Sequence, residues 1–254
     1  MIELVDVRLD HPRGEGRPLV TDANLKVTRG EVVVIIGAAG VGTSRIVAAV
    51  LGEVPPSAGR IELMGRDVAK LRRSSLRLLR RRIGIVPQEL CLLEDRSAQL
   101  NVALPLEIDG HPRSATILRA QEVLTRLDLE SEASLPIDCL SGAERQRVAV
   151  ARALVRKPEL VIADHPTSAQ DDTGALLVCG ALAEAAAAGA AVVLLGREPS
   201  LLAIAEQLRW RQHHLIDGKL IEVARSTIDE VIVDIDVDNN VVPFPLSART
   251  AGVA

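Results

Sequence analysis

The sequence predicts an α/β protein whose mostly parallel sheet is covered by helices on both faces. Three segments contain wholly apolar runs, which are typical of strands buried on both faces, and they lie at 25–36, 159–164 and 190–195. Helical patterns at 114–128 and 142–156 lie between the first of these strands and the second. Because strands that alternate with helices favour parallel pairing, the apolar segments should form one core sheet.

Local signals along the chain predict the other elements. Residues 2–9 alternate apolar and polar side chains, as a strand with one buried face does. A helix that begins at residue 44 should stop at Gly52, before Pro55 and Pro56. The remaining expected elements are a strand at 2–9, a helix at 44–51, a hairpin-like piece at 59–68, a basic helix at 71–82 and a strand at 83–87.

The segment after Gly218 has a different pattern. In "VIVDIDVDNN" (231–240), apolar side chains occupy one strand face, and Asp234, Asp236 and Asp238 occupy the other. Three carboxylates on one face could bind calcium, but the glycine and the closing glutamate of an EF-hand loop are missing. An acid-faced edge strand that resists aggregation is the preferred interpretation, followed by a mobile tail.

Composition limits the classes of partner. The 254-residue chain has a net charge of −4, one Phe, one Trp and no Tyr, which disfavours nucleic-acid binding by charge or by base stacking. The basic run at 71–82 is the exception, and we interpret it as a solvated helix. Three distant cysteines without a C-x-x-C pair suit free thiols in a reducing compartment. We expect neither a signal peptide nor a membrane span.

The stretch "VVVIIGAAGVGTSRIV" (32–47) is the first candidate site. Gly37, Gly42 and Ser44 fall on the positions of the phosphate-binding pattern G-x-x-x-x-G-K-[ST]. Backbone N–H groups of Gly40–Ser44 and the following helix N-terminus would cradle phosphate oxygens. Thr43 occupies the position of the lysine. The loop is therefore shaped to hold an anion but lacks the positive charge of the lysine, which would strengthen anion binding.

Four further pieces follow the glycine loop in a fixed order. They are Gln88 at the end of "IGIVPQ", "LSGAERQRVAVARAL" (140–154), "ELVIAD" (159–164) running into "HPTSAQD", and "LIDGKL" (215–220). Over residues 2–222 the chain resembles the ATP-binding cassette ATPases of the ABC family. Within that family it looks most like the branch of FtsE, LolD and MacB, whose members sit under a separate membrane protein.

The resemblance implies a fold and a domain organisation. The fold would be a P-loop NTPase of the ABC type, with a mostly parallel core sheet, an antiparallel β subdomain and a helical subdomain that carries the signature loop. The cassette would span residues 1–222, with its helical subdomain at about 89–156. Residues 223–254 would form a C-terminal extension.

The resemblance also implies residue roles. Gln88 would sense the terminal phosphate, and Mg²⁺ would be held by Ser44, Gln88 and Asp164. His11 stands where the family has an aromatic that stacks on adenine. Nucleotide contacts would come from His11, Gly37, Gly40, Val41, Gly42, Thr43, Ser44 and Arg45. Contacts across a cassette dimer would come from Ser141, Gly142, Ala143, Glu144 and Asp171.

Several positions depart from the family pattern. Thr43 replaces the lysine, His165 the catalytic glutamate and Arg197 the switch histidine; Ala143 and Gln170 are further exceptions. Losing one preorganised donor typically costs ~10²–10³ in rate. Arg45 would be a poor substitute for the lysine, because its side chain leaves the helix in another direction. The residues therefore predict ATP binding with weak or absent hydrolysis in the chain's own site.

We therefore expect a nucleotide-binding subunit of a membrane-associated ABC transporter or FtsEX-like complex. Its expected partners are a permease-like membrane subunit and a second cassette, identical or different, with ATP and Mg²⁺ as ligands. It would lie on the cytoplasmic face of the membrane. Two alternatives remain: an active ATPase that uses His165 or a displaced base, and a non-enzymatic adaptor that barely binds nucleotide.

The segment Gln88–Leu106 is the expected docking surface for the membrane subunit. It begins at the residue that would sense the terminal phosphate and continues through apolar stretches. Leu92, Leu93 and Glu94 are the candidates for exposure, whereas Leu104 and Leu106 could simply pack the helical subdomain.

Overall fold

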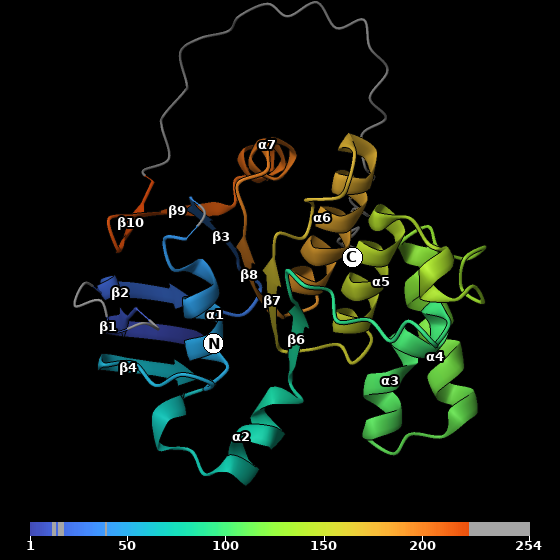
Figure 1. The fold of residues 1–254 in the computed structure, drawn as a ribbon, viewed down its shortest axis with the longest axis horizontal. Coiled ribbons are helices and arrows are strands. Elements are labelled where there is room, and N and C mark those ends of the chain that lie inside the picture. The colour runs from blue at the N-terminus through green and yellow to red at the C-terminus, as the bar shows by residue number, and fades with distance from the viewer. Residues whose placement is uncertain (12–13, 15–17, 39, 224–254) are drawn as a thin grey trace, which may run out of the picture. The chain divides into compact units, whose positions relative to one another are not determined.

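The strands of this computed structural model form two sheets, and the glycine-rich loop follows a central strand of the larger one (Figure 1). The structure describes residues 1–11, 14, 18–38 and 40–223, all within the unit Met1–Val223. In that part of the chain, the larger sheet has the order β10-β9-β3-β8-β7-β6 and the smaller sheet the order β2-β1-β4-β5. The expected strand at 231–240 and the tail lie outside the described residues.

The larger sheet is parallel except for β10 at its edge, and the smaller sheet is antiparallel throughout. The strands of the larger sheet are β3 (Val32–Gly37), β6 (Ile83–Val86), β7 (Leu160–Asp164), β8 (Ala191–Leu195), β9 (Arg211–Ile216) and β10 (Lys219–Glu222). Those of the smaller sheet are β1 (Ile2–Asp10), β2 (Pro18–Val27), β4 (Ala58–Leu63) and β5 (Arg66–Asp67). This arrangement confirms the mostly parallel core sheet and the antiparallel β part.

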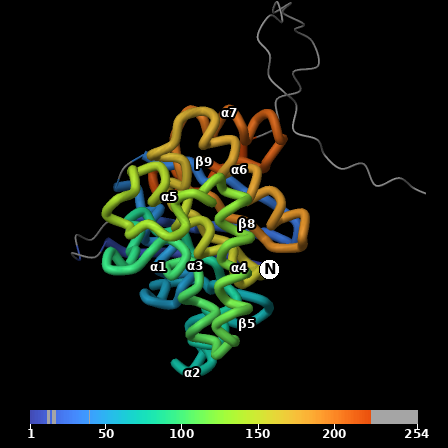
Figure 2. Tube along the Cα trace, turned by 90° about the vertical axis from the view of Figure 1, so that its right-hand side faces the viewer, coloured from blue at the N-terminus to red at the C-terminus, as the bar shows by residue number. Residues whose placement is uncertain are grey.

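Helices pack against the larger sheet, and some of them form a separate layer with α5. The described helices are α1 (Thr43–Val50), α2 (Arg73–Arg80), α3 (Ala98–Ile108), α4 (Arg113–Arg126), α5 (Gly142–Leu154), α6 (Asp172–Ala187) and α7 (Pro199–Gln207). Short 3-10 turns lie at Val68–Lys70 and Ile137–Cys139. Figure 2 shows α3 and α4 side by side, and both contact α5, which begins at the signature sequence. None of the described helices is long and apolar enough to cross a membrane.

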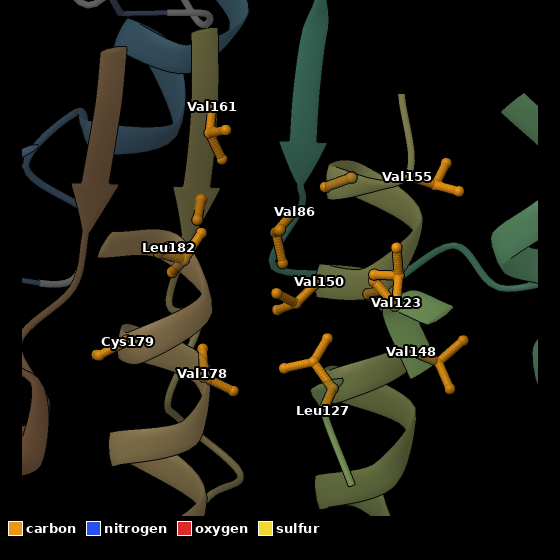
Figure 3. Close-up of a cluster of buried hydrophobic side chains, with 14 of the residues drawn as sticks. Val86, Val123, Leu127, Val148, Val150, Val155, Val161, Val178, Cys179 and Leu182 are labelled. Atoms are coloured by element: carbon orange, nitrogen blue, oxygen red, sulfur yellow. The ribbon is translucent and has the colours of Figure 1, made fainter. Parts of the chain in front are cut away.

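Alternate residues of each core strand serve two hydrophobic cores. On β3, Val32 and Val34 face the helices, whereas Val33 and Ile35 face α1 and the smaller sheet. Figure 3 shows the helical side, where side chains of β6, β7, α4, α5 and α6 meet. Because both faces are buried, the strands need apolar residues at every position, which explains the runs without alternation.

The expected continuous strand at 25–36 is wrong. The chain forms β2 and β3 instead, and a tight turn between Thr28 and Glu31 separates them. Gly30 has a left-handed backbone (φ 80°), and the Glu31 carboxylate accepts the Thr28 N–H at 2.8 Å. The turn sends β2 into the smaller sheet and β3 into the larger one, a partition that the apolar pattern alone did not indicate.

Candidate functional site

The glycine loop connects the end of β3 to the start of α1. Gly40 and Gly42 adopt left-handed backbone conformations (φ 81° and 113°), which residues other than glycine rarely adopt. A Cβ atom on Gly42 would also lie 3.2 Å from side-chain atoms of Leu19 and Val20. No side chain caps α1, so its first N–H groups point out of the helix end toward the loop. This geometry suits an anion held on backbone dipoles.

Thr43 and Val41 cover the first glycine of the loop with methyl groups. A Cβ atom on Gly37 would lie 2.9 Å from Cγ2 of both residues. The first residue of α1 therefore presents a methyl group toward the loop, in place of an ammonium group. Ser44 is exposed on the first turn, while Arg45 is half-buried with an Nε that has no hydrogen-bond partner.

Asp164 lies at the end of β7, and β8 lies between β7 and β3 in the sheet. Its side chain is buried, and its Oδ1 has no hydrogen-bond partner. Burial raises the pKa of Asp164 above its usual value, His165 opposes this shift, and Glu198 adds to it. An unpartnered buried carboxylate oxygen is suited to bind a cation that enters the site together with a ligand.

A metal ion at this edge would need oxygens beyond those of acidic side chains. Among the described residues, no group of three or more His, Cys, Asp or Glu side chains could hold a metal ion. The exposed Ser44 hydroxyl and the exposed Gln88, which follows β6, are the other residues expected to contact Mg²⁺. Phosphate and water oxygens would have to complete such a shell, as is usual for Mg²⁺.

His165 and Arg197 follow two neighbouring strands, β7 and β8. The His165 N–H donates to the Leu195 carbonyl at 2.7 Å and extends the ladder between these strands. The His165 ring contacts Asp164 and Glu198: Nε2 lies 4.0 Å from the Asp164 Oδ1, and Nδ1 is hydrogen-bonded to a Glu198 oxygen. Arg197 is exposed. Sequence reasoning missed Glu198, although an acidic residue just after a buried strand was a usable signal.

The signature residues begin α5 and form a separate group. Ser141 caps the helix, and Ser141 and Glu144 form a reciprocal capping box. The Ser141 N–H donates to the Glu144 carboxylate, which lowers the pKa of Glu144. Ser141 and Gly142 are exposed. Hydrogen bonds of Ala143 and of Gln146, further along α5, link the helix start to residues 168–170. Asp171 caps α6 through the Gly174 N–H.

A buried amide joins the signature helix to the segment after Asp164. Gln146 is 3% exposed, and its side chain donates to the His165 carbonyl at 2.8 Å and to Ser168 Oγ at 3.0 Å. Gln170 donates both to Gln146 and to the Ala143 carbonyl, at 3.0 and 2.9 Å. Gln170, one of the departures from the family pattern, therefore ties the two segments together.

We expect Gln146→Leu to lower the free energy of unfolding by about 1–3 kcal/mol, because it leaves buried backbone groups unpaired. Urea unfolding measures the change. Gln207→Leu, on the exposed end of α7, is the control and should stay within about 0.5 kcal/mol of the native protein. Equal midpoints for the Gln146→Leu variant and the native protein would show that the amide network carries no stability.

The comparison with known proteins decides the family. The family model "ABC transporter" matches residues 20–168. The chain belongs to the ABC transporter family. The lipoprotein-releasing system ATP-binding protein LolD of Neorickettsia sennetsu is 38% identical over 207 residues, covering 79% of this chain and 89% of that protein.

Other relatives of this ABC chain are longer or have known structures. The methionine import ATP-binding protein MetN of Caulobacter vibrioides is 39% identical over 171 residues, covering 67% of this chain and 51% of that protein. The chain thus spans about half the length of this MetN protein and of several other MetN proteins that it matches. A solved dimeric ATP-binding cassette bound to ADP and phosphate has a TM-score of 0.80 and 29% identity, covering 89% of this chain and 99% of that one. The expected ABC-type P-loop fold is confirmed.

Proposed function

We propose that this ABC chain is a nucleotide-binding subunit that holds MgATP in its own glycine loop and hydrolyses it slowly or not at all. One observation carries the proposal: the loop and helix start are shaped for phosphate, but residue 43 presents the Thr43 methyl group where the family pattern has a lysine. The buried Asp164 carboxylate supports nucleotide binding, since its Oδ1 has no hydrogen-bond partner and could bind a cation. Bound Mg²⁺ would neutralise phosphate charge.

The signature loop supports a role in a partner's site. Ser141 and Gly142 are exposed at the N-terminus of α5, and the capping box fixes their backbone. We infer that this surface completes the nucleotide site of a second cassette, identical or different, while the chain's own site stays slow. Similar solved cassettes form dimers. The proposed location is the cytoplasmic face of the membrane, under a permease-like subunit, as in a transporter or an FtsEX-like complex.

The proposed docking surface is the segment after Gln88. Hydrogen bonds from the neighbouring helices hold this segment. Arg152 donates to the Cys91 carbonyl at 2.7 Å, and the Asn101 side chain accepts from the Leu93 N–H and donates to the Leu93 carbonyl. The expectation that Leu92 is an exposed candidate is wrong, because it is partly buried and packs against the core. Leu93 and Glu94 are exposed.

We expect Leu93→Glu to abolish co-purification of an affinity-tagged chain with its membrane subunit, because a charge would replace an apolar contact. The thermal midpoint should barely change, since exposed substitutions stay within about 0.5 kcal/mol. Leu118→Glu is the matched control, because Leu118 on α4 is 64% exposed and lies outside the segment. Retention of the membrane subunit by Leu93→Glu would contradict the assignment of this surface.

A further inference from the structure

Helix α2 presents a row of arginines to solvent. Four exposed arginines on the helix and at its two ends form a surface that we call the basic face: Arg72, Arg73, Arg77 and Arg81. The opposite side of α2 is anchored to the core, where Leu79 is buried and Arg80 Nε donates to the Leu51 carbonyl at 2.8 Å. Packing therefore determines that the basic face points outward.

The charges of the basic face are poorly compensated within the chain. No carboxylate among the described residues pairs with its first three arginines. The fourth, Arg81, shares Asp109 with Arg156, at 3.6 and 2.7 Å. This pattern also opposes the helix itself, because no acidic side chain lies in the first turn and like charges four residues apart repel. Such a helix is stabilised by an anion from outside the chain.

Two large apolar side chains are exposed next to these arginines. Leu78 on α2 is 61% exposed, and Ile108 at the end of α3 is 60% exposed. The ion pair of Arg81 and Asp109 links their helices, and Figure 1 shows α2 and the turn between α3 and α4 at the same end of the described unit. Arginines combined with exposed aliphatic side chains are typical of a surface that lies on a membrane.

The basic face lies beside the proposed docking surface for the membrane subunit. Arg96, in the segment after Gln88, pairs with Glu107 at the end of α3 that contacts α2, with Nη1 and Oε2 3.5 Å apart. A chain docked through Leu93 would therefore bring α2 toward the lipid headgroups that surround the membrane subunit.

We propose that the basic face binds the phosphate groups of anionic lipids around the membrane subunit, with Leu78 and Ile108 entering the boundary between headgroups and acyl chains. This inference rests on the proposed location of the chain. Guanidinium groups bind phosphate oxygens through paired hydrogen bonds, and anionic lipids of the cytoplasmic leaflet attract them. A nucleic acid fits less well, because the chain has a net charge of −4 and the exposed apolar side chains here are aliphatic. The solvated helix expected at 71–82 thus describes the chain away from the membrane.

The test is flotation of the full, nucleotide-free chain with vesicles at about 10 mM salt, where the Debye length is about 30 Å. Vesicles of phosphatidylcholine are compared with vesicles in which half of the lipid is phosphatidylglycerol. We expect the native chain to float only with the anionic vesicles and to be released by about 1 M salt. Arg73→Gln/Arg77→Gln should weaken this binding at least ~10-fold, because each arginine near an anionic surface contributes several-fold.

Arg126→Gln/Arg209→Gln is the matched control. It removes the same charge from exposed positions at the ends of α4 and α7 and should leave vesicle binding nearly unchanged. Equal binding by the two double variants would overturn the proposal, as would failure of the native chain to float with anionic vesicles.

Other ligands of the basic face give different results. If Arg73→Gln/Arg77→Gln loses the membrane subunit in detergent but still binds vesicles like the native chain, the face contacts protein and the lipid proposal is wrong. Binding of a DNA duplex that this variant loses, without vesicle binding by the native chain, would equally contradict it. Flotation uses no nucleotide, so failure of the native chain to bind MgATP would contradict the proposed function and not this inference.

Discussion

Thr43→Lys should tighten MgATP binding by about 10- to 100-fold, because a hydrogen bond to a charged partner is worth about 1.5–3 kcal/mol. The substitution replaces the methyl group over Gly37 with an ammonium group that can reach the bound phosphates. His165→Glu should give no such gain. A glutamate there would stand beside Asp164 and Glu198, so like charges would oppose the approach of a triphosphate.

Calorimetry on both variants measures the difference. Thr43→Met is the matched control, since it adds length without charge and should leave the affinity near the native value. Equal affinities for Thr43→Lys and His165→Glu, or a larger gain for His165→Glu, would mean that residue 43 does not face the phosphates.

The double variant Thr43→Lys/Arg197→His should release phosphate at least ~10²-fold faster than the native chain, since a single preorganised donor is often worth that much. The pair restores two of the groups that the family pattern places around the terminal phosphate. It leaves the contact between His165 and Glu198 in place. A steady-state phosphate assay at saturating MgATP gives the ratio. An unchanged rate would show that neither missing group limits hydrolysis.

The same double variant tests the signature loop. Adding Ser141→Arg to it should abolish the gained activity if each site needs the signature of the other subunit. Mixing that triple variant with native chain should then restore phosphate release, because the native chain still offers Ser141 and Gly142. If Ser141→Arg leaves the activity intact, the signature surface does not complete the site.

Local signals predicted the parts of the site that depend on neighbouring residues. The glycine loop, Asp164 at a strand end and Ser141 at a helix start were found because each is marked by spacing and by an adjacent apolar run. The turn between β2 and β3 was missed, since it interrupts a pattern that reads as one strand. Its position depends on which of two sheets each half joins.

Contacts between distant segments could not be predicted in this way. Glu198 meets His165 only because β8 pairs with β7, and Gln146 meets residues 165–170 only because α5 packs beside that strand. Hydrogen bonds of this kind depend on the register and packing of elements, which composition and periodicity do not specify. Both contacts lie beside the candidate site. The sequence therefore predicted where the site lies but not the hydrogen bonds that position its side chains.

Steady-state phosphate release by the native chain at saturating MgATP measures the activity of the chain's own site. The phosphate-binding loop lacks its lysine, and His165 and Arg197 replace the catalytic glutamate and the switch histidine. We therefore expect a turnover at least ~100-fold below the enzyme median of ~10 s⁻¹. A turnover near ~10 s⁻¹ would contradict the proposed function, because it would show that the chain's own site is fully active.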